Sequence, residues 1–152
     1  MSLILASSSP FRKAILERLG VSFITVSPNI DETRKTPETP YDLVYRLAEE
    51  KAKEVAKTHS GLIIASDQVA TLDSGNDEGD EILNKPLTHE NAFAQLQKSS
   101  GRTVTFLTSI ALLNTETGIL QNHVEFFRVF FKSLSDNHIL SYLEKEDVLN
   151  CA

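Results

Sequence analysis

The chain has 152 residues, of which 41% are hydrophobic and 24% charged, and this balance is typical of one globular domain. Its net charge of -6 at pH 7 argues against a broad basic face, so we expect no binding to nucleic acid. The single cysteine, Cys151, excludes an internal disulfide and favours a reducing compartment such as the cytoplasm. The sequence has no long apolar run and no signal-peptide pattern, so we expect no membrane association.

The N-terminal segment predicts a buried strand that leads directly into a helix. Residues 3–6 are four consecutive apolar residues, as in a short buried strand. Ser9 is suited to cap a helix over residues 10–19, because Pro10 then occupies the first helical position. A second strand is expected at residues 23–27.

The next segment predicts a loop, a long helix and a second buried strand. Polar residues 28–38 are expected to form the loop. Thr39 then caps a helix over residues 40–57, which has proline at its first position and an acid at its third. Residues 61–66 form a continuous apolar run, which is typical of a strand in a sheet covered on both faces.

The second half of the chain predicts hairpins and two further helices. Residues 68–87 resemble a hairpin whose acid-rich tip, residues 73–81, is most simply solvated. The remaining expected elements are a helix from the cap Thr88 to 99, strands at 102–114 and 119–132 around a turn, and a helix from the cap Ser135 to 144. This order predicts an α/β fold with a mixed central sheet and helices on both sides.

The strand-to-helix junction at Ser7 has the features of an anion site. The first amides of the expected helix carry the positive end of its dipole, so a phosphate would be stabilised there. Arg12 and Lys13 add two cations at the same place. The alternative is a capped helix with basic residues on its surface.

Lys51 lies on the apolar stripe of the helix expected at 40–57. Val44, Leu47 and Val55 fall on one helical face, and Lys51 lies in the middle of that face. An isolated buried ammonium is very costly. Lys51 therefore either extends to solvent, pairs with a carboxylate, or points into a cleft and meets a phosphate.

Acidic residues at two positions could hold a divalent metal. Asp67 follows the apolar run at 61–66, and ligands bind beyond the carboxyl ends of strands in open α/β sheets. Asp31 and Glu32 could share a metal with Asp67, because magnesium sites often combine one or two carboxylates with substrate phosphates. The alternatives are a turn aspartate and a pair of solvated loop acids.

Other catalytic and metal-binding patterns are missing from the sequence. It contains no P-loop, dinucleotide fingerprint or nucleophile elbow. The segment 73–77 resembles a calcium loop only superficially, because Gly75 stands where an acid or amide is required. The four histidines lack metal-ligand spacing: His59, His89, His123 and His138.

Five segments together resemble the Maf family of nucleoside triphosphate pyrophosphatases. In chain order they are Leu5-Ala6-Ser7-Ser8-Ser9-Pro10-Phe11-Arg12-Lys13, Asp31-Glu32, Leu47-Ala48-Glu49-Glu50-Lys51-Ala52, Ser66-Asp67-Gln68 and Asn84-Lys85-Pro86. The resemblance implies an elongated fold of two lobes with a cleft, similar to inosine triphosphate pyrophosphatases and commonly homodimeric. It also implies substrate contacts at Ser7, Arg12, Lys51 and Lys85, catalysis by Asp67 as base, and Mg²⁺ or Mn²⁺ held by Glu32 and Asp67.

Phe11 indicates a substrate within that family. An aromatic residue followed by Arg12 and Lys13 resembles the branch that acts on 7-methyl-GTP, and an aromatic face attracts a flat cationic base. Gln68 could read the edge of the base. The alternative for Phe11 is a core position, and the alternative functions are a pyrophosphatase for dTTP, UTP or noncanonical nucleotides and a non-catalytic regulator of cell division.

The end of the sequence departs from the family pattern. Family members continue past the segment that matches residues 150–152, into a glycine-containing stretch and a final helix. We therefore expect this chain to lack the C-terminal part of the Maf-like domain.

Overall fold

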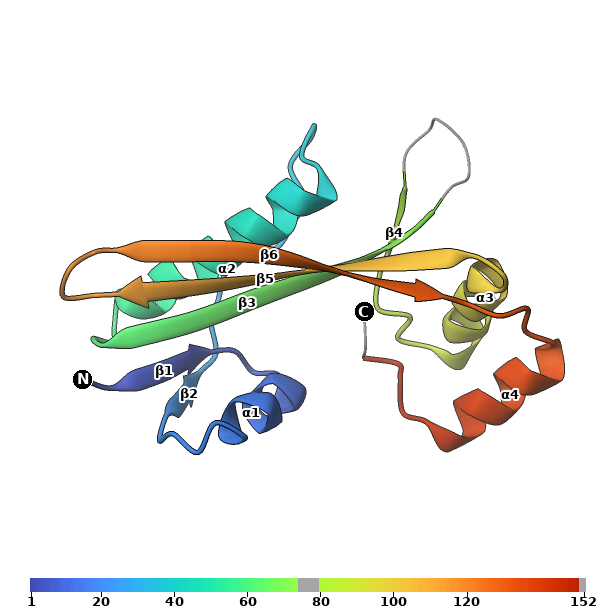
Figure 1. The fold of residues 1–152 in the computed structure, drawn as a ribbon, viewed down its shortest axis with the longest axis horizontal. Coiled ribbons are helices and arrows are strands. Elements are labelled where there is room, and N and C mark those ends of the chain that lie inside the picture. The colour runs from blue at the N-terminus through green and yellow to red at the C-terminus, as the bar shows by residue number, and fades with distance from the viewer. Residues whose placement is uncertain (74–79, 151–152) are drawn as a thin grey trace. The chain divides into compact units, whose positions relative to one another are not determined.

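The computed structural model describes residues 1–73 and 80–150 (Figure 1). The predicted hairpin tip, the calcium-like segment and Cys151 therefore lie wholly or largely outside the described residues. Within the described ranges, no helix is both long and apolar enough to cross a membrane.

The described strands form one mixed sheet of six strands, as predicted. Five of them are ordered β2-β1-β3-β5-β6, and β4 pairs with β3. β1 runs parallel to β2 and β3, whereas β3 and β4 are antiparallel. The strands are β1 (Leu3–Ala6), β2 (Ile24–Val26), β3 (Leu62–Leu72), β4 (Glu81–Leu83), β5 (Thr103–Asn114) and β6 (Leu120–Phe130).

All four helices begin at the predicted caps. The hydroxyls of Ser9, Thr39, Thr88 and Ser135 each accept a hydrogen bond from the backbone N–H three residues later, which satisfies one open donor of the first turn. The helices are α1 (Pro10–Glu17), α2 (Pro40–Ala56), α3 (His89–Ser99) and α4 (Asp136–Lys145).

The chain divides into two compact units. One consists of Met1–Asp67 and Thr108–Glu125, and the other of Gln68–Leu107 and Phe126–Ala152. The first unit contains α1 and α2, and the second contains α3 and α4.

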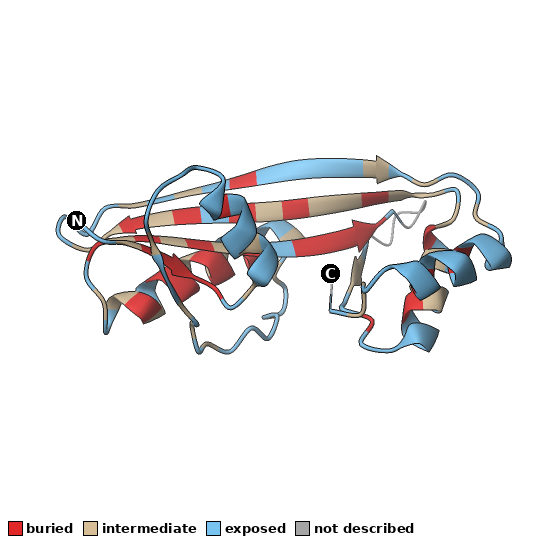
Figure 2. Ribbon diagram, turned by 90° about the horizontal axis from the view of Figure 1, so that it is seen from below, coloured by how far each residue is buried: buried red, intermediate tan, exposed pale blue. Residues whose placement is uncertain are grey.

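In the first unit, α1 and α2 cover opposite faces of the sheet. β2 and β3 flank β1 on its two sides, and both pair with it in parallel. Right-handed crossovers to either side therefore place α1 and α2 on opposite faces. On the side of the sheet covered by α2, residues of three strands and of α2 form a buried hydrophobic core (Figure 2): Ile4, Ala6, Ala52, Val55, Ile63, Ala65 and Leu113.

In the second unit, α3 packs against α4. Ala92 of α3 lies against Ile139 and Leu143 of α4, and all three are buried. The segment between β4 and α3 is also held here, because the N–H of Leu87 donates to the carbonyl of Leu149 at 2.9 Å.

Several predicted boundaries differ from those of the structure. The strand expected at 61–66 begins at Leu62, because Gly61 has φ 139°, and it continues through Asp67 to Leu72. The strand expected at 23–27 is shortened to Ile24–Val26, and the first helix ends at Glu17 instead of 19. A side chain on Gly61 would approach the backbone oxygen of Ser2 to 2.2 Å, so this position requires glycine.

Candidate functional site

Lys51 lies at the centre of the candidate site, in the first unit. Its ammonium nitrogen is 2.7 Å from Oδ1 of Asp67 and 3.1 Å from Oε1 of Glu32. The side chains of Lys51 and Asp67 are buried, whereas that of Glu32 is 57% exposed. Of the alternatives that the sequence left open, the structure selects pairing with a carboxylate, and it adds a second one.

The periodicities of a helix and a strand explain why Lys51 meets Asp67. Ile63, Ala65 and Asp67 alternate along β3 and therefore face the same side, which is the side covered by α2. Lys51 lies four residues before Val55 on α2, so the two side chains share the helix face that packs there. The ion pair between Lys51 and Asp67 therefore lies next to the apolar contacts between α2 and β3.

Asp67 lies inside a strand and yet beyond the end of a neighbouring strand. The pairing of β1 with β3 stops at Ala6 and Ala65, so Asp67 lies two residues beyond the last paired position. The prediction that Asp67 lies beyond the carboxyl end of its own strand was wrong, because β3 continues to Leu72.

Burial raises the pKa of the Asp67 carboxyl above its ordinary value. Desolvation has the largest effect, and the negative charge of Glu32 acts in the same direction. The charge and hydrogen bond of Lys51, together with the charge of Arg12, oppose the rise in pKa. A carboxyl group with a raised pKa is a better proton acceptor, as a general base requires.

Ser109 is a residue of this site that the sequence analysis missed. Its fully buried hydroxyl accepts from the Asp67 N–H at 3.0 Å and donates to the Asp67 carbonyl at 3.2 Å. One side chain thereby satisfies both backbone groups of the buried aspartate. A serine at an internal strand position was the available signal, but the register of β3 against β5 was needed to interpret it.

Arg46 holds the loop that carries Glu32, and it was also missed. Its guanidinium donates to both carboxylate oxygens of Glu38, at 2.5 and 2.9 Å, to Glu50 at 3.0 Å and to the carbonyl of Thr33 at 3.1 Å. This bidentate pairing lowers the pKa of Glu38 to about 2. Thr33, the loop residue next to Glu32, is therefore tied to α2 at Arg46, five residues before Lys51.

Asp31, the other acid of the predicted pair, has a different role. Its Oδ1 accepts from the N–H of Thr33 at 2.9 Å, and this hydrogen bond lowers the pKa of Asp31. Asp31 thereby shapes the loop, and Glu32 is the member of the pair that reaches Lys51.

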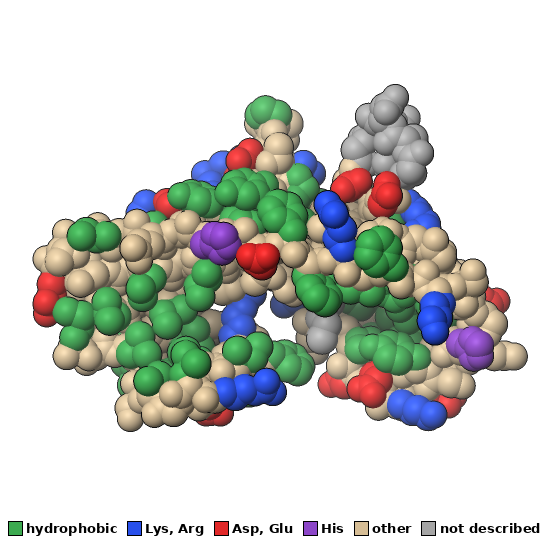
Figure 3. All heavy atoms as spheres, in the orientation of Figure 1, with side chains coloured by type: hydrophobic (Ala, Val, Ile, Leu, Met, Phe, Trp, Pro, Cys, Tyr) green, Lys and Arg blue, Asp and Glu red, His purple; other side chains and the backbone are tan. Residues whose placement is uncertain are grey.

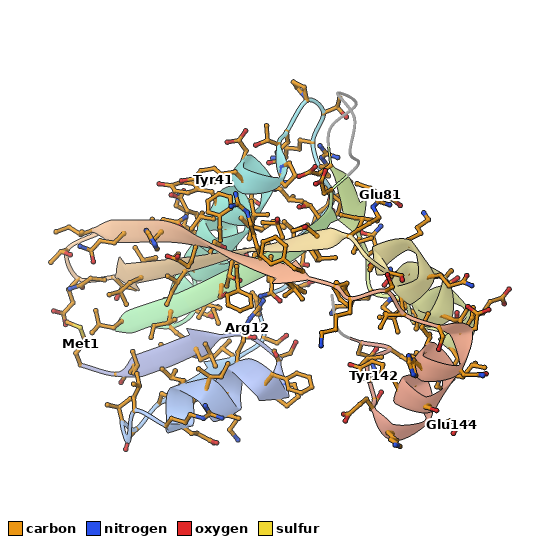
Figure 4. All side chains as sticks on the ribbon, turned by 45° about the vertical axis from the view of Figure 1, so that its right-hand side comes forward. Met1, Arg12, Tyr41, Glu81, Tyr142 and Glu144 are labelled. Atoms are coloured by element: carbon orange, nitrogen blue, oxygen red, sulfur yellow. The ribbon has the colours of Figure 1, made fainter. Side chains whose placement is uncertain are left out.

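Serine side chains hold the backbone of the strand-to-helix junction where an anion site is predicted. Oγ of the buried Ser7 accepts from the N–H of Ser9 at 3.1 Å, and Oγ of Ser9 accepts from the N–H of Arg12 at 3.3 Å. Figure 4 shows the side chain of Arg12 extending from α1 toward the sheet. Its positive charge acts on Asp67, so the junction and the carboxylate belong to one electrostatic environment.

Phe11 and Lys13 lie on the exposed surface of α1. Phe11 is 63% exposed, which excludes the alternative of a core position, and Figure 3 shows hydrophobic side chains over this helix. Lys13 lies 3.8 Å from Glu17 one turn later, as expected for a solvated helix pair. Neither residue is held by the Lys51 cluster.

Gln68 and Lys85 lie in the second unit. Gln68 is exposed on β3 and alternates to the face opposite Asp67. Lys85 is exposed in the segment between β4 and α3.

The Lys51 cluster offers two carboxylates to a divalent metal. Asp67 and Glu32 both lie beside the Lys51 ammonium, and carboxylate oxygens are the ligands that Mg²⁺ and Mn²⁺ prefer. The described residues contain no group of three or more His, Cys, Asp or Glu able to hold a metal. Water and substrate phosphate oxygens would therefore complete the coordination, as is usual for Mg²⁺.

Known proteins resemble this chain in sequence and in fold. The family described as Maf-like protein matches residues 2–152. A 7-methyl-GTP pyrophosphatase of Nitrosococcus oceani is 47% identical, over 99% of this chain and 73% of that protein. The Ham1 protein of Staphylococcus aureus has a TM-score of 0.57 at 15% identity, over 86% of this chain and 71% of that chain, which supports the fold alone.

Proposed function

This chain belongs to the Maf-like protein family, and from that premise we propose that it is a nucleoside triphosphate pyrophosphatase acting on 7-methyl-GTP. The products would be 7-methyl-GMP and pyrophosphate. The observation that carries the proposal is the buried ammonium of Lys51 between the carboxylates of Asp67 and Glu32. The 47% identity to a protein named for this reaction supports the choice of substrate.

Asp67 acts as the general base in the proposed reaction. Its carboxylate takes a proton from a water molecule as the water oxygen forms a bond to the α-phosphorus. The bond between the α-phosphorus and the bridging oxygen breaks, and pyrophosphate leaves with the electron pair. Lys51 keeps the Asp67 carboxylate ionised by pairing with it at 2.7 Å.

Positive groups offset the charge that develops on the leaving pyrophosphate. Arg12 and Lys85 supply mobile cations, and the first amides of α1 supply fixed dipoles near Ser7. Lys51 adds a fixed cation that is held by Asp67 and Glu32. Glu32 and Asp67 would hold a divalent cation, which when bound neutralises phosphate charge.

Phe11 accounts for the preference for a methylated base. Methylation at N7 makes guanine cationic, and the exposed ring of Phe11 offers a face on which such a base can stack. Gln68 would hydrogen-bond to the edge of the base. UTP and dTTP lack a cationic ring, so stacking on Phe11 does not favour them.

We also propose that the protein is cytoplasmic and homodimeric. A single cysteine and a nucleotide substrate fit the reducing cytoplasm. A homodimer would have twice the 16.9 kDa mass of the chain, which light scattering of the eluted protein measures directly.

Product analysis tests the proposed function. With Mg²⁺ present, the protein is incubated with 7-methyl-GTP, GTP, UTP and dTTP, and the products are identified by chromatography. We expect 7-methyl-GMP and pyrophosphate to form fastest, and Asp67→Asn to reduce the rate at least 100-fold. Tight nucleotide binding without pyrophosphate release would support the non-catalytic regulator instead, and faster turnover of UTP or dTTP would overturn the substrate assignment.

A matched substitution controls for lost charge. Glu125→Gln removes an exposed carboxylate of the same unit that pairs with His123, away from the Lys51 cluster. The rate of this variant should stay within twofold of the unmodified protein. Full activity in Asp67→Asn would refute the role of Asp67 as base.

A further inference from the structure

Lys85 combines a free side chain with a tightly held backbone. Within the described ranges, its ammonium group makes no hydrogen bond or ion pair, and the side chain is exposed. The carbonyls immediately before and after it, those of Asn84 and Pro86, both accept hydrogen bonds. A mobile cation on a fixed backbone is suited to binding an anion.

Two side-chain amides of α3 provide these hydrogen bonds. Nε2 of Gln95 donates to the carbonyl of Asn84 at 2.6 Å, and Nδ2 of Asn91 donates to the carbonyl of Pro86 at 2.9 Å. Residues 91 and 95 are four apart and lie on one face of the helix, one turn from each other. The two amides therefore bracket Lys85 from a single rigid element.

The rest of the segment is also constrained. Pro86 is buried and has a fixed φ, and Leu87 has φ 62°, a left-handed conformation that leucine rarely adopts. The N–H of Leu87 donates to the carbonyl of Leu149, and Thr88 caps α3. A strained residue persists only where surrounding contacts determine its conformation, and such residues cluster at ligand-binding sites.

We propose that Asn91 and Gln95 are positioning residues that fix Lys85 for binding the substrate phosphates. This inference rests on the proposed function, in which Lys85 contacts the triphosphate. A lysine side chain has many rotamers, so a fixed backbone limits the region that its ammonium can reach. Binding of a charged phosphate then requires less ordering of the protein.

A purely structural role for the two amides makes a different prediction. If they only join β4 to α3, their loss lowers stability and acts on activity independently of Lys85. If they act through Lys85, their loss has no further effect once the ammonium group is removed. A double-mutant cycle separates these cases.

The experiment combines Gln95→Ala and Asn91→Ala, each with and without Lys85→Ala. Gln97→Ala is the matched control, because this amide also lies on α3 but donates to Asp136 Oδ1 at 3.1 Å. We expect Gln95→Ala and Asn91→Ala to raise KM for 7-methyl-GTP roughly three- to tenfold, with smaller changes in kcat, and Gln97→Ala to change KM less than twofold. In the Lys85→Ala background, neither substitution should raise KM further.

Hydrogen exchange gives a readout that requires no nucleotide. The backbone amide of Leu87, which donates to the carbonyl of Leu149, should exchange faster in Gln95→Ala than in Gln97→Ala. Equal exchange rates in the two variants, or equal KM increases with and without Lys85, would overturn the inference alone. An unmodified protein that hydrolyses no nucleotide would overturn the proposed function and this inference together.

Discussion

Lys51 shows how one buried charge can organise a site. Its ammonium group lies on the apolar face of α2, where burial without a partner would be very costly. Asp67 and Glu32 compensate for that cost with two contacts at 2.7 and 3.1 Å. The pair is therefore retained at some expense of stability for what it can do chemically.

Replacing Lys51 should destabilise the fold. Lys51→Met leaves the Asp67 carboxylate buried without its cation, and we expect the free energy of unfolding to fall by about 3 kcal/mol. Urea unfolding followed by circular dichroism measures this change. Lys53→Met, on the exposed side of the same helix, removes only a surface pair with Glu49 and should change stability by less than about 0.5 kcal/mol.

A comparable loss of unfolding free energy in both variants would contradict the energetic role of the buried Lys51–Asp67 pair. It would show that the α2 face tolerates an unpaired carboxylate, so the contact between Lys51 and Asp67 would not determine the local energetics.

The raised pKa of Asp67 predicts a pH dependence of activity. A general base must be ionised, so kcat/KM should fall as the pH drops through a pKa above 3.8, the ordinary aspartate value. Glu32→Gln removes a negative charge that raises this pKa, so the acid limb should move to lower pH. The pH profile of kcat/KM locates the limb even where Glu32→Gln lowers the maximum rate, and an upward shift would oppose this assignment.

At the scale of elements, the loop at 28–38 depends on α2 for its conformation. Arg46 ties Glu38 and Thr33 to the helix, and this places Glu32 within 3.1 Å of Lys51. The site therefore depends on a second ion pair, formed by Arg46 five residues before Lys51 on α2.

The Glu38–Arg46 pair predicts a stability change at low pH. The pKa of Glu38 falls from 4.5 to about 2 on folding, so the pair contributes stability that is fully present above pH 4.5 and is lost as the pH falls toward 2. Glu38→Gln should therefore lower Tm at pH 6, with a difference that disappears near pH 2. Differential scanning calorimetry measures both values, and Glu144→Gln, an exposed position on α4, should show no such dependence.

Local patterns predicted the elements more reliably than their contacts. Caps such as Thr39 and Thr88 determine where helices begin, and the structure confirms them because a capping hydroxyl acts within three residues. The end of β3 was predicted wrongly. The apolar run stops before Asp67, but the strand continues to Leu72 and pairs there with β4. Hydrophobicity reports the surroundings of a strand and not its hydrogen bonds.

The sequence indicated that Lys51 needs a partner but left that partner open. The pairing with Asp67 depends on the register of β3 under α2, which no local pattern specifies. Ser109, Arg46 and Gln95 were missed for the same reason, since each acts on a backbone or side chain that is distant in sequence. Long-range contacts of this kind follow from topology.

At the scale of the molecule, the residues assigned to the substrate are distributed over both compact units. Ser7, Arg12 and the Lys51 cluster belong to the first unit, and Gln68 and Lys85 belong to the second. Each unit has its own hydrophobic core. Ion pairs hold Lys51 in the first unit, and side-chain amides of α3 hold the backbone around Lys85 in the second. The central claim is that the chain catalyses one reaction, the attack of water at the α-phosphorus.

Hydrolysis of 7-methyl-GTP in water enriched in oxygen-18 tests that claim most directly. Mass spectrometry of the products shows which phosphorus the water attacks. We expect one heavy oxygen in 7-methyl-GMP and none in the pyrophosphate. Heavy oxygen in pyrophosphate, or release of orthophosphate in its place, would contradict that claim.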